Sequence, residues 1–212
     1  MSIDVKNHPS GVGKFYAAAL EGDIQAQFKL GMRLIETPQR DPWIDEYKKG
    51  LKWLIEAAEN EHPGAQARLS IIYSGGFYNV PKDIGIAIKW GVLAAEYGRY
   101  QDQHTLALLY TGGIRTGELT SDSYEEAIKW FKAAAKQGNK KSSRSISVIY
   151  RNGWNGKKYP EKAYMFYLLS IKDNKEPHPY QLKLYTKDLS KEQVEKVNKE
   201  ASNWLVENSV EQ

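Results

Sequence analysis

The four histidines are the side chains best suited to bind a metal ion or to transfer a proton near neutral pH. His8 lies in the N-terminal segment, His62 and His178 lie next to prolines in predicted connectors, and only His104 falls on a predicted helix. No two of them are three or four residues apart, the spacing that puts two ligands on one helical face, and His-Glu-x-x-His is absent. The chain has no cysteine, which excludes disulfides, thiolate metal sites and cysteine nucleophiles. We therefore predict no metal site and no cofactor.

Other short catalytic signatures are also missing. Neither Ser-x-x-Lys nor G-x-S-x-G, which mark two common serine nucleophiles, occurs in the chain. The pairs Gly75-Gly76 and Gly112-Gly113 do not fit the phosphate-binding pattern G-x-x-x-x-G-K-[ST] and follow no predicted strand, so we interpret them as helix ends. Adjacent carboxylates such as Glu125-Glu126 point to different faces of a helix. We predict that the protein is not an enzyme.

Basic residues gather in one part of the chain. The net charge is only +4, yet the segment 136–175 holds just two acidic residues, Glu161 and Asp173. Its basic residues are Lys136, Lys140, Lys141, Arg144, Arg151, Lys157, Lys158, Lys162, Lys172 and Lys175. A local positive field steers acidic partners, although lysines on an outer face also serve simply as solvated surface. The pI of 8.9 is below the ~9 expected of a nucleic-acid-binding domain, and no such motif occurs, so we predict no nucleic-acid partner.

The elements that position these residues follow from an internal repeat. Three tryptophans each stand four residues before an Ala-Ala pair: Trp53, Trp90 and Trp130. A second series keeps the same register, with steps of 37 to 40 residues: Leu30, Leu69, Leu106 and Ile146. A period of this size is the signature of stacked helical hairpins. The sequence therefore predicts an all-α fold.

Helix patterns and punctuation divide each repeat into two helices. We expect the first helices at 23–36, 64–75, 101–112 and 141–152, and their partners at 43–60, 83–97, 122–137 and 159–173. The first helices are expected to end at or near Gly75, Gly112 and Gly153, because glycine readily adopts the left-handed turn that closes a helix.

The two ends of the array are expected to differ from its middle. The segment 14–22 matches the end of a second helix, but it carries Lys14 where the tryptophan would stand. Near the C-terminus, a short helix is expected around 180–185. Ser190 and Gln193 then form a capping box that begins a capping helix at about 190–207. We predict an α/α superhelix, or solenoid, of about four hairpins with a C-terminal capping helix, forming a single domain over 1–212.

Nothing in the sequence reaches the ~18 uninterrupted apolar residues of a membrane span. The first twenty residues lack the apolar run of a secretion signal. We expect a cytoplasmic monomer, or a periplasmic one if a signal has been removed.

The chain resembles the Sel-like repeat proteins, α/α relatives of the tetratricopeptide repeats. The resemblance is clearest in AQARLSIIYSGGFYNVPKDIGIAIKWGVLAAEYG, residues 65–98. The family form is an Ala…Leu-Gly…Tyr…Gly helix, a loop, and a Lys-Ala-x-x-Trp…Ala-Ala…Gly helix. Segments 23–60, 101–138 and 141–173 match progressively less well, and the fourth has Phe166 in place of tryptophan. The repeats are expected at 23–60, 64–98, 101–138 and 141–173.

This resemblance implies an adaptor or scaffold whose concave groove binds other proteins. Bacterial members include immunity proteins that block a toxic effector, and hydrolase activity has been proposed for some cysteine-rich relatives. The chain lacks the cysteines of that branch, and we find no nucleophile or acid/base pair for a hydrolase.

The inner-face positions of tetratricopeptide repeats, carried over to this chain, predict the groove. Met32, Ile71, Leu108 and Val148 are expected to form its apolar floor or to belong to the core, and Ile35 and Ala67 are further positions of the inner face. The predicted partner-binding residues are Gln25, Phe28, Ser74, Gln101, His104, Thr111, Lys141, Arg144 and Arg151. They change from neutral to basic along the array. Our first hypothesis is a scaffold that binds an acidic peptide or protein surface, and the second is an immunity-type inhibitor of a toxic effector enzyme.

Overall fold

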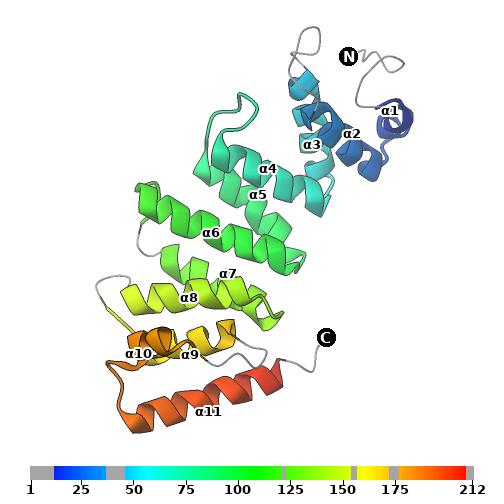
Figure 1. The fold of residues 1–212 in the computed structure, drawn as a ribbon. Helices are drawn as coiled ribbons and strands as arrows, with labels where there is room; N and C mark the ends of the chain where they lie inside the picture. The colour runs from blue at the N-terminus through cyan, green and yellow to red at the C-terminus, as the bar shows by residue number, and fades with distance from the viewer. Residues whose placement is uncertain (1–11, 37–45, 121–122, 154–156, 172–176, 209–212) are drawn as a thin grey trace. The chain divides into compact units, whose positions relative to one another are not determined.

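The computed structural model of the protein describes residues 12–36, 46–120, 123–153, 157–171 and 177–208. All regular elements within these ranges are α-helices, as the repeat predicted (Figure 1). The chain divides into two compact units, 1–97 and 98–212, and each is described by itself. Predicted features at His8, 41–45, 121–122, Lys172, Asp173 and Lys175 lie outside the described residues.

Unit 1 contains five helices within its described residues. They are α1 (Gly13–Leu20), α2 (Ile24–Glu36), α3 (Glu46–Glu59), α4 (Pro63–Gly75) and α5 (Ile84–Glu96). Helices α2 and α3 form one hairpin, and α4 and α5 form the next. The hairpin α2–α3 is closely packed because both helices carry a glycine where their backbones meet. A β-carbon added to Gly31 would lie 2.9 Å from the carbonyl oxygen of Gly50.

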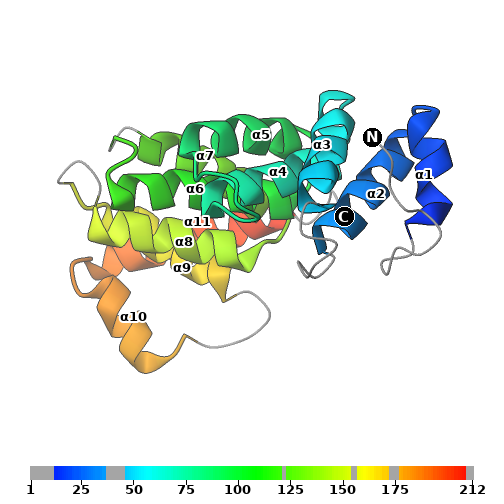
Figure 2. The same ribbon diagram turned by 90° about the horizontal axis from the view of Figure 1, so that it is seen from above.

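Unit 2 repeats this arrangement and ends it. Its described helices are α6 (Tyr100–Thr116), α7 (Ser123–Lys136), α8 (Lys140–Asn152), α9 (Pro160–Ser170), α10 (Pro179–Thr186) and α11 (Lys191–Glu207). Helices α6–α7 and α8–α9 form two hairpins, and both α10 and α11 pack on α9. Figure 2 shows the short helix α10 on one side of α8 and α9, outside the stack of hairpins.

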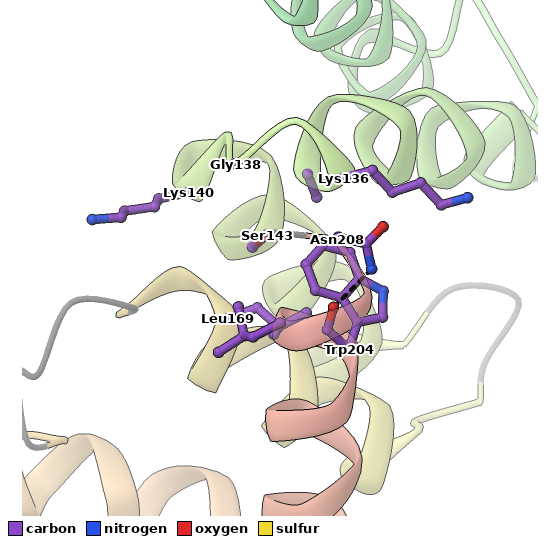
Figure 3. A pocket seen from close by; sticks show the side chains of 9 residues that line it. Lys136, Gly138, Lys140, Ser143, Leu169, Trp204 and Asn208 are labelled. Atoms are coloured by element: carbon purple, nitrogen blue, oxygen red, sulfur yellow. Dashed lines mark hydrogen bonds between the residues drawn. The ribbon is translucent and has the colours of Figure 1, made fainter. Parts of the chain in front are cut away.

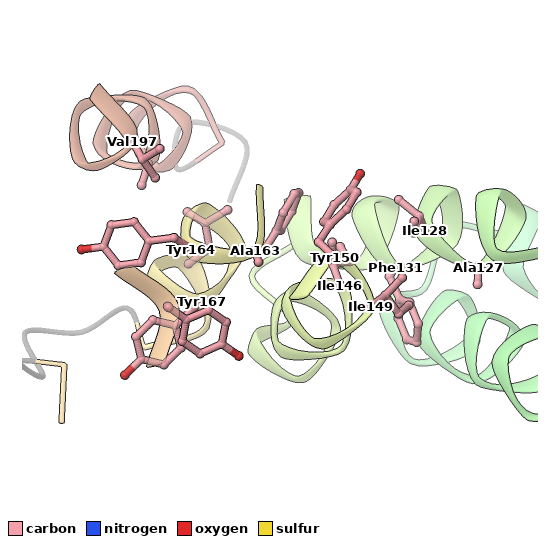
Figure 4. Packing of buried hydrophobic residues seen from close by; sticks show 14 of the residues in the cluster. Ala127, Ile128, Phe131, Ile146, Ile149, Tyr150, Ala163, Tyr164, Tyr167 and Val197 are labelled. Carbon is pink, nitrogen blue, oxygen red and sulfur yellow. The ribbon is translucent and has the colours of Figure 1, made fainter. Parts of the chain in front are cut away.

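The core of unit 2 runs as one layer from α7 to α11. Phe131 of α7, Ile146 of α8 and Tyr164 of α9 are buried in it, and Val197 of α11 closes its end (Figure 4). The hydroxyl of Tyr164 also donates a hydrogen bond of 3.0 Å to Asn198 Oδ1. Helix α11 is thus the predicted capping helix, and Ser190 and Gln193 form the predicted capping box at its start.

The last turn of α11 covers the end of the core of unit 2. Trp204 and Asn208 lie beside Leu169 and the turn that contains Gly138 (Figure 3). The space left among them is about 10 Å³, about enough for one water molecule. This recess is therefore too small for a ligand larger than water.

One expectation about local structure was wrong. Helix α6 does not end at Gly112-Gly113 but continues to Thr116, and Gly117 closes it with φ 79°. A glycine inside a helix costs about 1 kcal/mol of stability relative to alanine. The packing of α6 on α7 offsets this cost. His62 lies in the predicted connector between α3 and α4, where it is buried and its Nδ1 accepts a 3.1 Å hydrogen bond from the Ala65 amide at the start of α4.

Candidate protein-binding groove

A groove of about 780 Å³ lies between α6 and α8 in unit 2. It is lined by the predicted residues Leu108, Thr111, Arg144 and Val148. The side chain of Leu108 is 47% exposed, so the floor presents apolar surface to solvent. The predicted inner face of these two helices therefore does form a concave surface.

The walls of the groove carry cations on both sides. Arg144 stands on α8, and Arg115 stands on the last turn of α6. No aspartate or glutamate is among the groove-lining residues, and within the described part of the chain neither arginine forms an ion pair with a carboxylate. The groove thus combines an apolar floor with positive walls.

Arg144 is held in place by an aromatic ring. Its guanidinium lies 5.3 Å from the centre of the Tyr167 ring, a cation–π contact, and its Nη2 donates a 3.3 Å hydrogen bond to Gln181 Oε1 of α10. Burial raises the pKa of Tyr167, while the positive charge of Arg144 lowers it. The Tyr167 hydroxyl is therefore uncharged at neutral pH, and the neutral ring packs against the guanidinium.

Arg151 is held in the same way by the neighbouring ring. Its guanidinium lies 5.3 Å from the centre of the Tyr185 ring, and the Tyr167 and Tyr185 rings are stacked with centres 4.4 Å apart. Tyr185 is only 3% exposed, and its hydroxyl accepts a 2.7 Å hydrogen bond from Ser147. A chain of contacts therefore links the two arginines through two buried tyrosines.

The other end of α6 forms a second recess of about 550 Å³. It contains three of the predicted residues, Gln101, His104 and Lys141. His104 Nδ1 lies 2.8 Å from Ser142 Oγ, and its ring packs against Phe131. Burial lowers the pKa of His104, and the positive charge of Lys141 lowers it further. At neutral pH the recess therefore has a neutral imidazole beside a lysine.

In unit 1 the predicted residues Gln25 and Phe28 contact His62, and Ser74 bonds to its own helix. Gln25 Nε2 lies 2.6 Å from His62 Nε2, and the ring of Phe28 stacks on the His62 ring with centres 4.3 Å apart. Ser74 donates a 2.9 Å hydrogen bond to the carbonyl oxygen of Ile71 in its own helix. Ile35, predicted for the inner face, is buried in the core.

The family model of the Sel1 repeat matches residues 24–62, 63–98, 103–139 and 145–174. The chain belongs to the Sel1 repeat family. Proteins of this family act as scaffolds for protein interaction and are generally not enzymes. The groove lies between α6 of the third Sel1 repeat and α8 of the fourth. The recess at the other end of α6 lies between the same two hairpins.

The fold is shared with a solved structure of a Sel1 repeat protein. The crystal structure of a Sel1 repeat protein from Oxalobacter formigenes has a TM-score of 0.58 and 22% identity, and covers 93% of this chain and 80% of that chain. A protective antigen of uropathogenic Escherichia coli has a TM-score of 0.43 at 19% identity, covering 92% and 48%. Immunity protein Pa5087 from Pseudomonas aeruginosa has a TM-score of 0.39 at 17% identity, covering 86% and 81%. No curated protein sequence matches the chain.

Three contributors to the Sel1 repeat groove were missed by sequence reasoning. Arg115 was overlooked because the first helix was expected to end at Gly112. Gln181 and Tyr185 lie on α10, outside all four repeats, and no repeat position marks them. The aromatic residues of α10 were a signal in the sequence, but they did not indicate which rings contact the arginines.

Among the residues that the structure describes, no group of three His, Cys, Asp or Glu side chains could hold a metal ion. None of the helices formed by these residues is long and apolar enough to cross a membrane.

Proposed function

We propose that the protein is a scaffold that binds an acidic segment of another protein in the groove of unit 2. The observation that supports this most directly is the pairing of Arg115 and Arg144 on opposite walls of an apolar groove that has no carboxylate in its lining. Guanidinium groups bind carboxylates through paired hydrogen bonds, and the apolar floor accommodates aliphatic side chains between them.

The support of Arg144 by Tyr167 strengthens the proposal. A long cationic side chain normally loses rotamer freedom when it binds, at a cost of about 0.5–1.5 kcal/mol. The cation–π contact and the Gln181 hydrogen bond already restrict Arg144 before a partner arrives. This restriction favours binding over simple solvation of the charge.

The binding test uses a fluorescent peptide of alternating glutamate and leucine, with a glutamine–leucine peptide as the neutral control. Fluorescence anisotropy is measured on the full chain at low and physiological salt. We expect the acidic peptide to bind more tightly, and its affinity to fall as salt rises, because exposed charges are screened. Equal affinity for the two peptides would contradict the proposal.

Charge-reversal variants locate the site. Arg144→Glu and Arg115→Glu are expected to weaken binding of the acidic peptide by about tenfold or more each. Lys199→Glu makes the same change of charge on an exposed position of α11, and Lys132→Glu does so on α7; neither residue lines the groove. A loss of affinity as large in the two lysine variants as in the arginine variants would show a general charge effect rather than a groove.

Inhibition of an effector enzyme would be one specific form of this function. Such an inhibitor would bind through a one-to-one complex that abolishes the activity of its partner. Once a natural partner is in hand, calorimetry gives the stoichiometry, and an assay of that partner with wild-type protein and Arg144→Glu tests for inhibition through the groove.

A further inference from the structure

A second cavity adjoins the groove at the C-terminal end of α8. Its volume is about 370 Å³, and it lies between the end of α8, the start of α9 and the end of α10. Asn152 lines both this cavity and the groove, so the two spaces meet at that residue. Arg151, predicted as a groove residue, lines this cavity instead. We call it the end pocket.

The lining of the end pocket carries more positive than negative charge. Three cations line it, Arg151, Lys158 and Lys187, and Asp188 is the one carboxylate in its lining. Among the described residues, none of these four side chains forms an ion pair. Asp188 therefore offsets only part of the positive charge that lines the pocket.

The guanidinium of Arg151 is fixed at one side of this pocket. Its Nη1 donates a 3.4 Å hydrogen bond to the Tyr185 hydroxyl, and its Nε donates one of 3.4 Å to Asn152 Oδ1. The Tyr185 ring, itself buried, lies against the guanidinium. An arginine has five N–H donors, so donors remain that have no acceptor among the described residues.

The remaining wall is apolar and limits the size of the ligand. Pro160, Ala163 and Leu184 supply this wall. A volume of about 370 Å³ is at the lower end of the range for small-molecule sites, which suits one side chain rather than an extended segment. A fixed guanidinium opposite an aliphatic wall fits a carboxylate on a short aliphatic stem.

We propose that the end pocket binds one carboxylate of the peptide segment that occupies the groove. The inference rests on the proposed function for the identity of the occupant, and it adds a specific contact at one end of the bound segment. The carboxylate belongs either to an acidic side chain or to the free C-terminus of the segment. Both sources offer the same planar group to Arg151, with Lys158 and Lys187 adding attraction.

The test uses small probes that do not need the groove. In ¹H–¹⁵N spectra of the full chain, the Nε–H signal of Arg151 is assigned by its loss in Arg151→Lys. It is then followed during titration with acetyl-glutamate amide, which carries a side-chain carboxylate, and acetyl-leucine, which carries a terminal one. Acetyl-leucine amide and inorganic phosphate are the controls.

A saturable shift of the Arg151 signal with either carboxylate supports the proposal, and the probe that binds more tightly identifies the source. Lys187→Glu is expected to weaken that binding by about fivefold, while Lys199→Glu leaves it unchanged. Both lysines are exposed, so the variants keep their fold. No shift with either carboxylate, or shifts as large with acetyl-leucine amide or phosphate, would overturn it.

The groove and the end pocket can fail separately. Arg144→Gln should leave binding of the small probes to the end pocket intact, because Arg144 does not line it. If the alternating peptide binds the groove but the probes leave Arg151 unaffected, the end pocket is refuted while the proposed function stands. If the probes bind but the alternating peptide does not discriminate acid from amide, the proposed function is refuted.

Discussion

The two units of the molecule build similar hairpins but use their inner-face residues differently. In unit 1, Gln25 and Phe28 contact His62, and the side chain of Ser74 bonds to its own helix. In unit 2, Arg144 and Arg151 rest on tyrosine rings and find no carboxylate among the described residues. Shared repeat positions thus serve internal structure in one unit and present charge in the other.

The interiors of the units differ as well. The hairpin α2–α3 depends on backbones that meet at Gly31 and Gly50, whereas unit 2 depends on stacked tyrosines. Unit 1 has a pocket of about 290 Å³, and it is electrically balanced by Lys52 and Glu56. This contrast indicates that the positive charge of the groove in unit 2 does not follow from the repeat fold itself.

The largest expected effect is on the tyrosine stack. Tyr185→Ala removes a buried ring that contacts Tyr167 and Arg151, and should lower the free energy of unfolding by about 3 kcal/mol. It should also weaken binding of the acidic peptide. Tyr185→Phe keeps the stack but loses the hydrogen bond from Ser147, and should lower stability by about 1 kcal/mol. Urea denaturation gives both values, and similar values for the two variants would show that the stack is unimportant.

A change at the glycine contact tests the other side of the comparison. Gly31→Val puts side-chain atoms where Gly50 and Leu54 already lie, and should lower stability by about 2 kcal/mol. Because the groove is built by unit 2, its affinity for the acidic peptide should not change at temperatures where the protein stays folded. Denaturation and anisotropy measure the two effects, and a loss of affinity in the folded variant would show that the units are coupled.

Exchanging charge between the units sharpens the comparison further. Gln25→Arg places a cation at the inner-face position of unit 1, and it should change affinity for the acidic peptide by less than about twofold. Arg144→Gln in unit 2 should reduce that affinity about tenfold. Anisotropy with the two variants decides between a local groove and an effect of total charge, which would make the two changes comparable in size.

A stabilising change is expected at Gly112. This glycine lies inside α6, and a β-carbon added to it meets no atom within 4 Å. Gly112→Ala should therefore raise the free energy of unfolding by about 0.5–1 kcal/mol. Thermal denaturation measures the effect, and a lower melting temperature would contradict the continuous helix.

The smallest effect is the pH dependence from His104. Because its pKa is lowered in the folded state, the unfolded chain takes up a proton first as the pH falls. Stability from this group is complete above the ordinary histidine pKa of about 6.5 and is lost as the pH falls through the lowered one. His104→Gln should lose less stability between neutral and mildly acidic pH. Denaturation midpoints across that interval test this, and an equal loss in both proteins would contradict it.

The hairpin register and the capping helix could be predicted because they depend on patterns local to each repeat. The spacing of Leu30, Leu69, Leu106 and Ile146 follows from the length of the repeat unit, and all four are buried. The course of α6 past Gly112 could not be predicted, because packing on α7 overrides the low helix propensity of glycine. For this reason Arg115 was not predicted as a groove residue.

The tyrosine support of the arginines was out of reach for a different reason. Tyr185 bonds to Ser147 across 38 positions of sequence, and no repeat spacing predicts such a pairing. The sequence could indicate that Arg144 and Arg151 face a common side, but only tertiary structure shows that Arg151 turns to the end pocket. Positions were predictable from register, whereas the contacts of long side chains were not.

Helix α10 is eight residues long and buries a single side chain, Tyr185. Leu182 also packs against the core and Gln181 bonds to Arg144, but Tyr180 and Lys183 are exposed, so substitutions at these two positions alter the surface of α10 without disturbing the repeats. A lineage of such proteins could therefore change partners by altering this short helix alone. The same property makes α10 a compact target for engineering new binding preferences into an otherwise unchanged array.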